Sequence, residues 1–314
     1  MTSEPELIRL IRGIARHPAA RGLADDAAVW EIGGERLVLT HDSMVESVHF
    51  LPGDPAEDVA WKLVATNMSD LAAKGARPLA CLMAYGMGGD AEWDRAFVAG
   101  LGDALDHYGA ALLGGDSFAQ PDGNARCLGL TAIGKSSVPV PPSRSGAQPG
   151  DILYVTGAIG NGWAGLQLLR QDRTEPASLI AAYRRPRALI AEGVALAQIA
   201  HAMMDVSDGL LLDAARMAAA SGLGLEIALD RIPLSPDFCA VFGTSRQARL
   251  DAATGGDDYQ LLFAAHPDAL LPVDAHPVGR FAAGNGLSLT DHGEAVPLPE
   301  NTGWLHHPAA SGAG

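Results

Sequence analysis

Acidic residues recur along the chain beside Gly, Ala or Ser, at places where strands, loops or helices should begin or end. Seven of them share this setting: Asp25, Asp26, Asp42, Asp70, Asp116, Asp205 and Asp208. Each alone could be a cap or a turn residue. If several converge, two charges at 4 Å repel by about 1 kcal/mol in water and by about 4 kcal/mol at an effective dielectric constant of 20. Hard divalent cations would remove that cost, and all-oxygen ligation indicates Mg²⁺ or Mn²⁺ rather than zinc.

Carboxylates that hold several Mg²⁺ ions serve phosphoryl chemistry more often than any other. The formal net charge of −15 argues against nucleic acid as a partner. It also means that a polyanionic substrate needs metal ions or a local basic pocket. Arg144 is a candidate for such a pocket, whereas Arg184 and Arg185 are expected on a solvated helix face.

The segment 37–50, LVLTHDSMVESVHF, is the stretch around which the chain is organised. Its apolar start predicts a strand, and the polar residues from Thr40 onward predict that this strand ends there and delivers Asp42 at its tip. The alternative is a hairpin end with a turn-forming Asp. His49 is close to no second metal ligand and no nucleophile motif, so a structural histidine remains open beside a binding role.

Two helices of the first half have recognisable starts. Ser3–Glu6 and Asp54–Glu57 both read as capping boxes. The second helix should run to about Lys74, with Gly75 just past its end. Asp70 lies inside this helix among Leu and Ala, where an acid costs free energy unless it is paired or liganded.

Strands and helices alternate in both halves of the 314 residues, which predicts an α/β (α+β) protein of two domains. The Pro- and Ser-rich segment 136–150 is the linker candidate, giving domains 1–140 and 141–314. Further helices are expected near 91–108, 163–170, 177–183, 188–200 and 208–219. Further strands are expected near 79–85, 110–113, 126–133, 152–156, 202–205, 223–229 and 259–264, and the tail from Pro308 is expected to be disordered.

One motif is a chance match. Residues 129–136, GLTAIGKS, fit the phosphate-loop expression GxxxxGK[ST]. The variable positions are strand material, however, and the following SSVPVPP cannot open a helix. The glycine turn 157–162 lies between a strand and a helix, where phosphate could bind, but a tight structural turn is favoured.

The composition also bears on whether the protein is a membrane, secreted or disulfide-rich protein. No apolar run approaches the ~18 residues of a membrane span, and no secretory signal pattern opens the chain, so a cytoplasmic protein without a membrane partner is expected. Cys81, Cys127 and Cys239 are too widely spaced for a disulfide framework or a zinc site.

Seven segments occur in a familiar order: GLADDAAV, LTHDS…VHF, NMSDLAAKGARP, LLGGDS, SRSGAQPGD, DVSDGLLLD and GGDDYQLLF. Together they resemble the thiamine-monophosphate kinase family, over nearly the whole chain from Gly22 to Trp304. The resemblance implies the two-domain fold of the aminoimidazole ribonucleotide synthetase-like superfamily. Its N-terminal domain would be a β-sheet or barrel-forming unit that binds ATP and Mg²⁺ and dimerises, followed by a C-terminal α/β domain.

The resemblance also implies site residues. The Mg²⁺ set would be Asp26, Thr40, Asp42, Asp70, Asp116, Asp205 and Asp208. ATP would be contacted by Gly115, Asp116, Arg144 and Ser207, and thiamine monophosphate by His49, Asp257 and Trp304. Asp42, Asp208 and Arg144 would act in the transfer itself.

The chain departs from the usual family pattern at three of these segments. Ala24 replaces a Gly, and His41 replaces a Ser or Thr, so a metal contact there would have to come from the backbone carbonyl. Asp257 stands where the family usually has Glu, one methylene longer, which makes that substrate contact the least secure.

The function implied is ATP-dependent phosphorylation of thiamine monophosphate to thiamine diphosphate, by direct in-line transfer in a homodimer. The acceptor is an ionised phosphate oxygen, so no general base is required. Trp304 could stack on the cationic thiazolium ring and Asp257 could attract it. The alternatives are another ATP-dependent synthetase or ligase of the superfamily, and a non-catalytic module that senses nucleotide and Mg²⁺.

Overall fold

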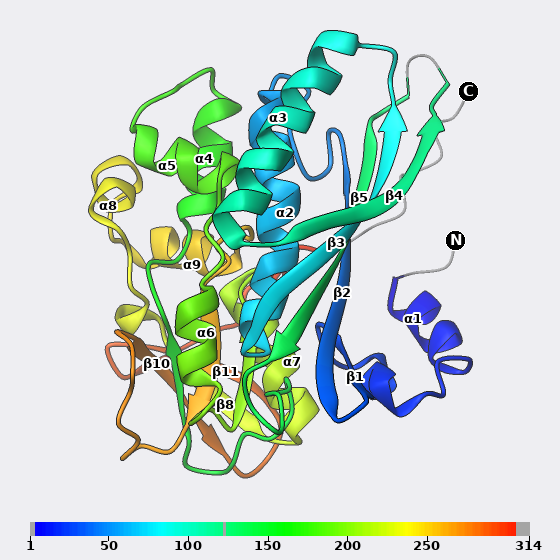
Figure 1. The fold of residues 1–314 in the computed structure, drawn as a ribbon. Coiled ribbons are helices and arrows are strands. Elements are labelled where there is room, and N and C mark those ends of the chain that lie inside the picture. The colour runs from blue at the N-terminus through cyan, green and yellow to red at the C-terminus, as the bar shows by residue number, and fades with distance from the viewer. Residues whose placement is uncertain (1–3, 122–123, 306–314) are drawn as a thin grey trace.

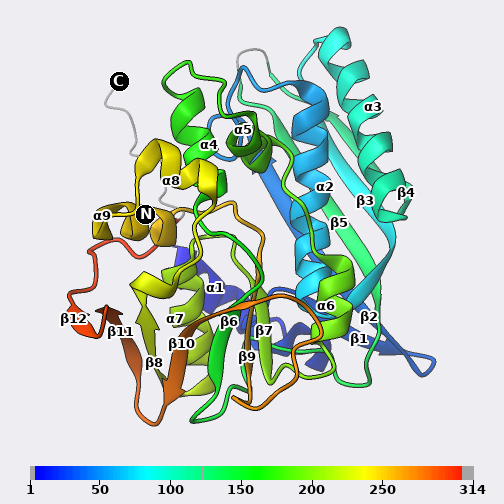
Figure 2. The ribbon, with the colours of Figure 1, turned by 90° about the vertical axis from the view of Figure 1, so that its left-hand side faces the viewer.

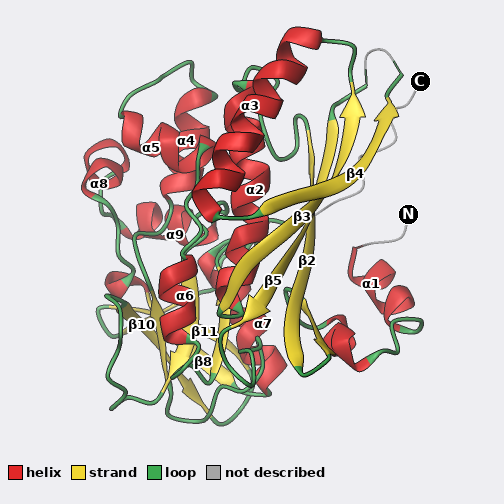
Figure 3. Ribbon diagram, in the orientation of Figure 1, coloured by secondary structure: helices red, strands yellow, loops and turns green. Residues whose placement is uncertain are grey.

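Two β-sheets built from successive parts of the chain form the framework of the computed structural model, which describes residues 4–121 and 124–305 (Figure 1). The first sheet has the strand order β1-β2-β5-β3-β4, and the second has the order β12-β11-β8-β10-β6-β9-β7. Helices pack between and around the sheets, as the colouring of Figure 3 shows. The mixed α and β architecture predicted from the alternating pattern is confirmed, whereas the domain boundary at 140 stays a prediction.

The first sheet is covered on one face by two long helices (Figure 1). Its strands are β1 (Ala28–Ile32), β2 (Glu35–Val45), β3 (Ala76–Met87), β4 (Ala111–Ala119) and β5 (Cys127–Ser136). The helices are α2 (Ala56–Ala73) and α3 (Ala91–Tyr108). On β5, Leu128, Leu130 and Ala132 are buried in the core shared with these helices. Every residue of the edge strand β4 is exposed.

Strand β2 is longer than predicted. Every residue from Leu37 to Val45 pairs with β5, so Asp42 lies within the strand and not at its tip. The polar run does not end the strand because its side chains alternate between two environments. Thr40 and Met44 are buried, whereas His41 and Ser43 are exposed on the opposite face. The predicted strand end and the turn alternative were therefore both wrong.

Helix α2 is buried on nearly every side, because 14 of its 18 residues are buried. It begins after Pro55 without a side-chain cap, so the capping box predicted at Asp54 is wrong. The Asp54 carboxylate instead accepts hydrogen bonds from Arg184 Nε (3.0 Å) and from the Leu51 N–H (2.8 Å). At the other end, Gly75 has a φ of +61°, as the predicted helix stop requires.

The second sheet forms the lower part of the molecule (Figure 2). Its strands are β6 (Ile152–Val155), β7 (Ala202–Asp205), β8 (Gly224–Ala228), β9 (Leu261–Ala265), β10 (His276–Ala282), β11 (Gly286–Asp291) and β12 (Glu294–Val296). The helices of this part are α4 (Asn161–Leu169), α5 (Ala177–Arg184), α6 (Ile190–Leu196), α7 (Leu210–Ser221), α8 (Pro236–Phe242) and α9 (Arg246–Thr254), with a 3₁₀ turn η2 (Leu229–Arg231). Strand β7 begins and ends as predicted.

The N-terminal segment contains α1 (Glu4–Arg12) and a 3₁₀ turn η1 (Pro18–Leu23). The predicted cap residue Ser3 and the tail from Pro308 lie outside the described residues. The phosphate-loop look-alike 129–136 lies wholly within strand β5, which confirms that it was a chance match. Arg185 is exposed, as expected, and forms an ion pair with Asp58 of α2, whereas Arg184 is only partly exposed because it forms an ion pair with the buried Asp54.

No helix in the described part of the chain is long and apolar enough to cross a membrane.

Candidate active site

Three carboxylates from distant parts of the sequence converge between the two sheets. Asp26 lies in the loop before β1, Asp70 lies on α2, and Asp205 ends β7. One carboxylate oxygen from each lies within 4.8 Å of the others. Burial, with the neighbouring Asp26, raises the pKa of Asp205 to about 8. Burial and nearby acids also raise the pKa of Asp70 well above its usual value. The predicted convergence is thus confirmed for these three residues.

Asp42 adds a fourth acid to this acidic cluster of Asp26, Asp70 and Asp205. Burial, together with the charges of Asp26 and Asp208 and against the opposing effect of His41, raises the pKa of its carboxyl to about 6. A closely spaced all-oxygen donor set that resists ionisation is one that a hard divalent cation would relieve. The donor chemistry of these residues therefore fits the Mg²⁺ site predicted from the sequence.

The NMSD segment of α2 holds the acids in place. Asn67 Oδ1 accepts a hydrogen bond from the Asp42 N–H (3.1 Å). Ser69 Oγ donates to Asp205 Oδ2 (2.5 Å), and the Thr40 hydroxyl donates to Asp70. One helix therefore ties strand β2 of the first sheet to strand β7 of the second. Thr40 contacts the cluster through Asp70, and its role as a Mg²⁺ ligand stays a prediction.

Two cations of the chain neutralise one side of the cluster. Lys74 is fully buried, and its Nζ lies 2.6 Å from Asp26 Oδ2 and 2.6 Å from Asp25 Oδ1. Arg144 Nε donates to Asp26 Oδ1 (2.6 Å). Although burial opposes the effect, Lys74 and Arg21 lower the pKa of Asp25 to about 2. Asp25 is therefore an ion-pair partner, whereas Arg144 lies beside the predicted metal ligands.

The loop after β7 supplies another predicted acid, Asp208, which forms an ion pair with Arg216. The backbone N–H groups of Ser207 (3.1 Å) and Asp208 (3.0 Å) both donate to Asp213 Oδ2. Burial, with the charge of Asp208, raises the pKa of Asp213 to about 7. Asp213 therefore fixes the backbone of the loop that carries Ser207 and Asp208.

The residues predicted to contact thiamine monophosphate lie on the edge of the same region. Asp257 Oδ2 accepts a hydrogen bond from Lys62 Nζ (2.7 Å), and Lys62 also donates to the His49 carbonyl oxygen (3.1 Å). The Trp304 N–H donates to the carbonyl oxygen of Asp208 (2.8 Å), and Trp304 is 49% exposed. His49 and Asp257 are thus joined through Lys62, and Trp304 lies next to Asp208.

Close backbone approach explains the glycines of the GGDD segment. A Cβ on Gly256 would lie 2.5 Å from the Ser207 carbonyl oxygen. The Asp257 N–H donates to that same oxygen (2.9 Å). Only a glycine therefore lets the loop that carries Asp257 lie directly against the loop that carries Ser207.

Asp116 and Gly115 lie apart from the acidic cluster in the single chain. Along the sheet, Asp116 pairs with Ala84, Ala84 with Gly129, and Gly129 with Ser43. Because paired residues of neighbouring strands share a face, Asp116 lies on the exposed face with Ser43, opposite to Asp42. Their roles in binding ATP and Mg²⁺ stay predictions.

Several residues of the site were missed. They are Lys62, Asn67, Ser69, Lys74, Asp213 and Arg216. The two lysines carry a usable signal, because each stands in an apolar helical stretch, AWKLVA and LAAKG. A cation that such a helix buries needs an acidic partner.

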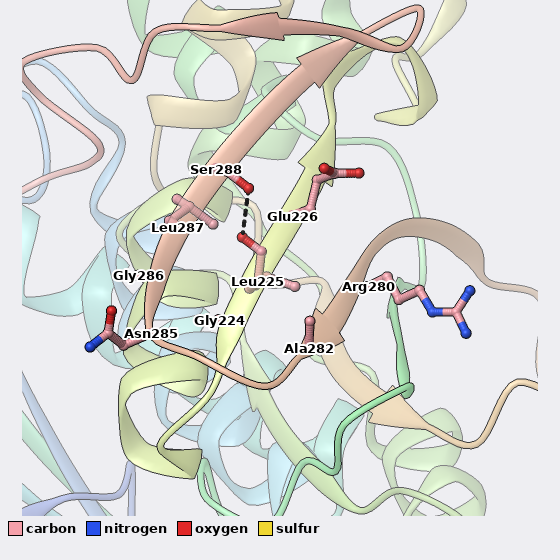
Figure 4. A pocket seen from close by; sticks show the side chains of 9 residues that line it. All are labelled: Gly224, Leu225, Glu226, Arg280, Ala282, Asn285, Gly286, Leu287 and Ser288. Carbon is pink, nitrogen blue, oxygen red and sulfur yellow. Dashed lines mark hydrogen bonds between the residues drawn. The ribbon is translucent and has the colours of Figure 1, made fainter.

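Two cavities lie elsewhere. One of about 240 Å³ lies against strands β8, β10 and β11 (Figure 4), where Glu226 and Arg280 are cross-strand neighbours. The other, of about 470 Å³, is lined by residues that include Arg187, Glu192 and Gln260. None of the predicted site residues lines either cavity, so the acidic cluster is the better candidate for the site of chemistry.

Known proteins share this arrangement over almost their whole length. Residues 24–136 match the family "AIR synthase related protein, N-terminal domain", and residues 148–271 match its C-terminal domain. The thiamine-monophosphate kinase of Caulobacter vibrioides is 36% identical, over 97% of this chain and 91% of that protein. The chain belongs to the thiamine-monophosphate kinase family.

Two further relatives support this membership. The thiamine-monophosphate kinase of Aquifex aeolicus is 32% identical, over 95% of this chain and 96% of that protein. A solved structure described as "AaThiL complexed with AMPPCP and TMP" matches with a TM-score of 0.87 and 31% identity, over 97% of both chains. The family resemblance drawn from the seven sequence segments is therefore confirmed.

Proposed function

We propose that the protein transfers the terminal phosphoryl group of ATP directly to thiamine monophosphate, giving thiamine diphosphate and ADP, with Mg²⁺ held by the acidic cluster. The observation that carries the proposal is the convergence of Asp26, Asp70 and Asp205 within 4.8 Å. Membership of the kinase family supports the reaction, and the similar AaThiL structure with AMPPCP and TMP supports the pair of substrates.

The acceptor needs positioning and charge neutralisation more than activation. A phosphate oxygen of thiamine monophosphate is already ionised at pH 7, so the site needs no general base. The residues that would hold Mg²⁺ are Asp26, Thr40, Asp42, Asp70, Asp205 and Asp208, with Asp116 as a further predicted ligand. When bound, Mg²⁺ neutralises phosphate charge and stabilises the charge that develops in the transition state.

Arg144 and Lys74 would have different roles in the proposed reaction. The side chain of Lys74 has no exposed surface, whereas that of Arg144 is 24% exposed. Arg144 can therefore turn one of its N–H groups toward a phosphate while Lys74 continues to compensate Asp25 and Asp26. Ser207 lies on the loop beside Asp208, where its hydroxyl could contact ATP.

The acceptor would bind between His49, Asp257 and Trp304. The half-exposed indole of Trp304 offers a face on which the cationic thiazolium ring could stack. The carboxylate of Asp257 would supply the complementary negative charge. Together these contacts would orient the acceptor phosphate toward the acidic cluster.

We further propose a homodimer formed through the uncovered face of the first sheet. Exposed apolar side chains gather on its last two adjacent strands, among them Leu79, Leu82, Leu113 and Phe118. An open sheet edge with apolar side chains favours association, and a second copy of this chain would cover it. Asp116 lies on the same face, so its contact with ATP would be made within the dimer.

The deciding experiment is incubation with ATP, Mg²⁺ and thiamine monophosphate, with the products read by mass. Equal amounts of ADP and thiamine diphosphate are expected, with none after chelation of the metal. Thiamine is the matched control, because its hydroxyl would need a base to become the acceptor. A dehydrated or ring-closed product would favour a synthetase, and tight ATP binding without turnover would favour a sensing module. The cytoplasm, where ATP is available, is the proposed compartment.

A further inference from the structure

A buried lysine of α2 joins the two parts of the predicted acceptor site. The Lys62 side chain is 3% exposed and is flanked in the sequence by Trp61 and Leu63. Its Nζ donates to Asp257 Oδ2 (2.7 Å) and to the His49 carbonyl oxygen (3.1 Å). It also lies 4.0 Å from the centre of the Tyr183 ring. An ammonium group has three N–H donors, so these contacts use its capacity.

These contacts bridge segments that are far apart in the sequence. His49 lies between β2 and α2, whereas Asp257 lies 195 residues after Lys62, just before β9. Two of the three residues predicted to contact thiamine monophosphate are therefore held by the same nitrogen atom. No member of the acidic cluster is bonded to Lys62 among the described residues.

The Asp257 carboxylate is fixed at both of its oxygens. Lys62 occupies Oδ2, and the hydroxyl of Tyr259 donates to Oδ1 (2.9 Å). The backbone beneath it is constrained as well, because Asp257 has a φ of +68°, in a region that non-glycine residues seldom adopt. Without Lys62, the carboxylate would keep one side-chain partner and could rotate about it.

We propose that Lys62 is a positioning residue for the acceptor substrate, which acts by fixing the carboxylate of Asp257 and the loop that carries His49. The inference rests on the proposed function, because it takes Asp257 as a contact to thiamine monophosphate. Since Lys62 is buried, it acts through these neighbours and not by touching the substrate. Its loss should impair the thiamine monophosphate side of the site and spare the ATP side.

The test compares Lys62→Met, which keeps the length and removes the charge, with Asp257→Asn and the double variant. For Lys62→Met, KM for thiamine monophosphate should rise about tenfold, as expected for loss of a charged hydrogen bond, while KM for ATP stays within about twofold. The rise in KM for the double variant should be smaller than the product of the two single effects, because part of the effect of Lys62 runs through Asp257 and part through the His49 loop. Lys135→Ala, at a half-exposed pair with Glu35, is the matched control.

Two results would overturn the proposal. One is an unchanged KM for thiamine monophosphate in folded Lys62→Met, with only a lower melting temperature, since that is the mark of a structural lysine. The other is an equal rise of KM for both substrates. Should Lys62→Met fail to fold, Lys62→Arg carries the test, because it keeps the charge and changes the reach. If the wild-type protein makes no thiamine diphosphate, the proposed function fails; calorimetric binding of thiamine monophosphate to the same variants then still tests the positioning role.

Discussion

The Nζ of Lys74 lies 2.6 Å from Asp26 Oδ2, and both side chains are almost completely buried. This contact divides the acids of the site into two groups. Asp25 and Asp26 are compensated by cations of the chain itself. Among the described residues, no Lys or Arg ion pair reaches Asp70 or Asp205, and the pKa of each is raised. Asp26 therefore has cation partners from the chain on one side of the cluster, whereas Asp70 and Asp205 form the side that would need a bound cation.

Lys74→Met should destabilise the metal-free protein by about 3–5 kcal/mol, because it leaves two buried carboxylates without their shared cation. Urea denaturation in the presence of a chelator measures this loss in the free energy of unfolding. Lys135→Ala is the control, since its pair with Glu35 is exposed and should be worth less than about 1 kcal/mol. Mg²⁺ should raise the melting temperature of Lys74→Met more than that of the wild type. Equal stability of the two proteins in chelator would contradict a compensating role for Lys74.

Stability without metal should fall as the pH rises. Burial and like charge raise the pKa of Asp42 to about 6 and of Asp205 to about 8, against 3.8 for an ordinary Asp. Between pH 4 and these values the folded protein binds more protons than the unfolded chain. The stability that these groups contribute is thus complete below about pH 4 and is lost as the pH passes through about 6 and then about 8.

Thermal melts in chelator from pH 5 to pH 9 measure this dependence. Mg²⁺ should raise the melting temperature more at pH 8 than at pH 5, because protons compete with the cation for the same carboxylates. The lowered pKa of Asp25 acts only at pH values near 2 to 4 and does not disturb this range. A melting temperature that climbs with pH in chelator would show that these acids are ionised in the folded protein.

Charge on the uncovered sheet face should break the proposed dimer. Leu82→Asp and Leu113→Asp place a carboxylate among side chains that are exposed in the single chain. Light scattering after size-exclusion chromatography should show a monomer, with KM for ATP raised if Asp116 acts within the dimer. Leu270→Asp is the control, because this leucine is 91% exposed and lies far along the chain from the first sheet. A wild type that already elutes as a monomer would refute the dimer.

Signals in the local sequence predicted the bounds of several elements closely. Features that depend on pairing between distant segments could not be predicted from the sequence. Helix α3 was predicted at its observed bounds because its ends are marked, by Asp90 as N-cap and by Gly109 with a φ of +67°. The prediction ended strand β2 too early, because its polar residues continue the strand by pairing with β5. Pairing with a distant strand is invisible in the strand's own sequence.

The same limit applies to the site. The apolar surroundings of Asp70 signalled a liganded acid, and it does lie in the cluster. The facing direction of Asp116 depends on the register of four strands, including an irregularity between β3 and β4. The bonds of Lys62 and Lys74 depend on the packing of α2 against loops of both sheets. Such facts follow from tertiary packing and not from residue type.

Lys135→Ala should leave activity and ATP affinity nearly unchanged. Lys135 lies in β5, where it pairs with Leu37 and Arg77 across the sheet and contacts Glu35 at 2.7 Å. A phosphate-loop lysine would instead stand at the start of a helix. Steady-state kinetics with ATP measure the effect. A hundredfold loss of activity together with weaker ATP binding would reinstate the phosphate-loop interpretation of residues 129–136.

Asp42→Asn separates a metal role from a structural one, because it keeps the shape of the side chain and removes its charge. Folding should survive, and the melting temperature in chelator should stay level or rise, since one repulsive carboxylate is gone from a buried cluster. Turnover at saturating Mg²⁺ should fall on the order of a hundredfold or more, because a ligand of the ion that stabilises the transition state is lost. Ser43→Ala, the next residue of β2 on the exposed face, should alter neither measurement.

A loss of stability in Asp42→Asn without a loss of turnover would contradict a metal-binding role for Asp42. Its backbone N–H already has a partner in Asn67, so the strand does not depend on the carboxylate for its hydrogen bonds. A structural role would therefore have to come from the charge itself, in a place where burial and the nearby acids Asp26 and Asp208 disfavour charge. If Asp42→Asn lowered the melting temperature in chelator while turnover per folded molecule stayed near wild type, the charge would be serving the fold. The assignment of the acidic cluster to Mg²⁺ would then rest on Asp26, Asp70 and Asp205 alone.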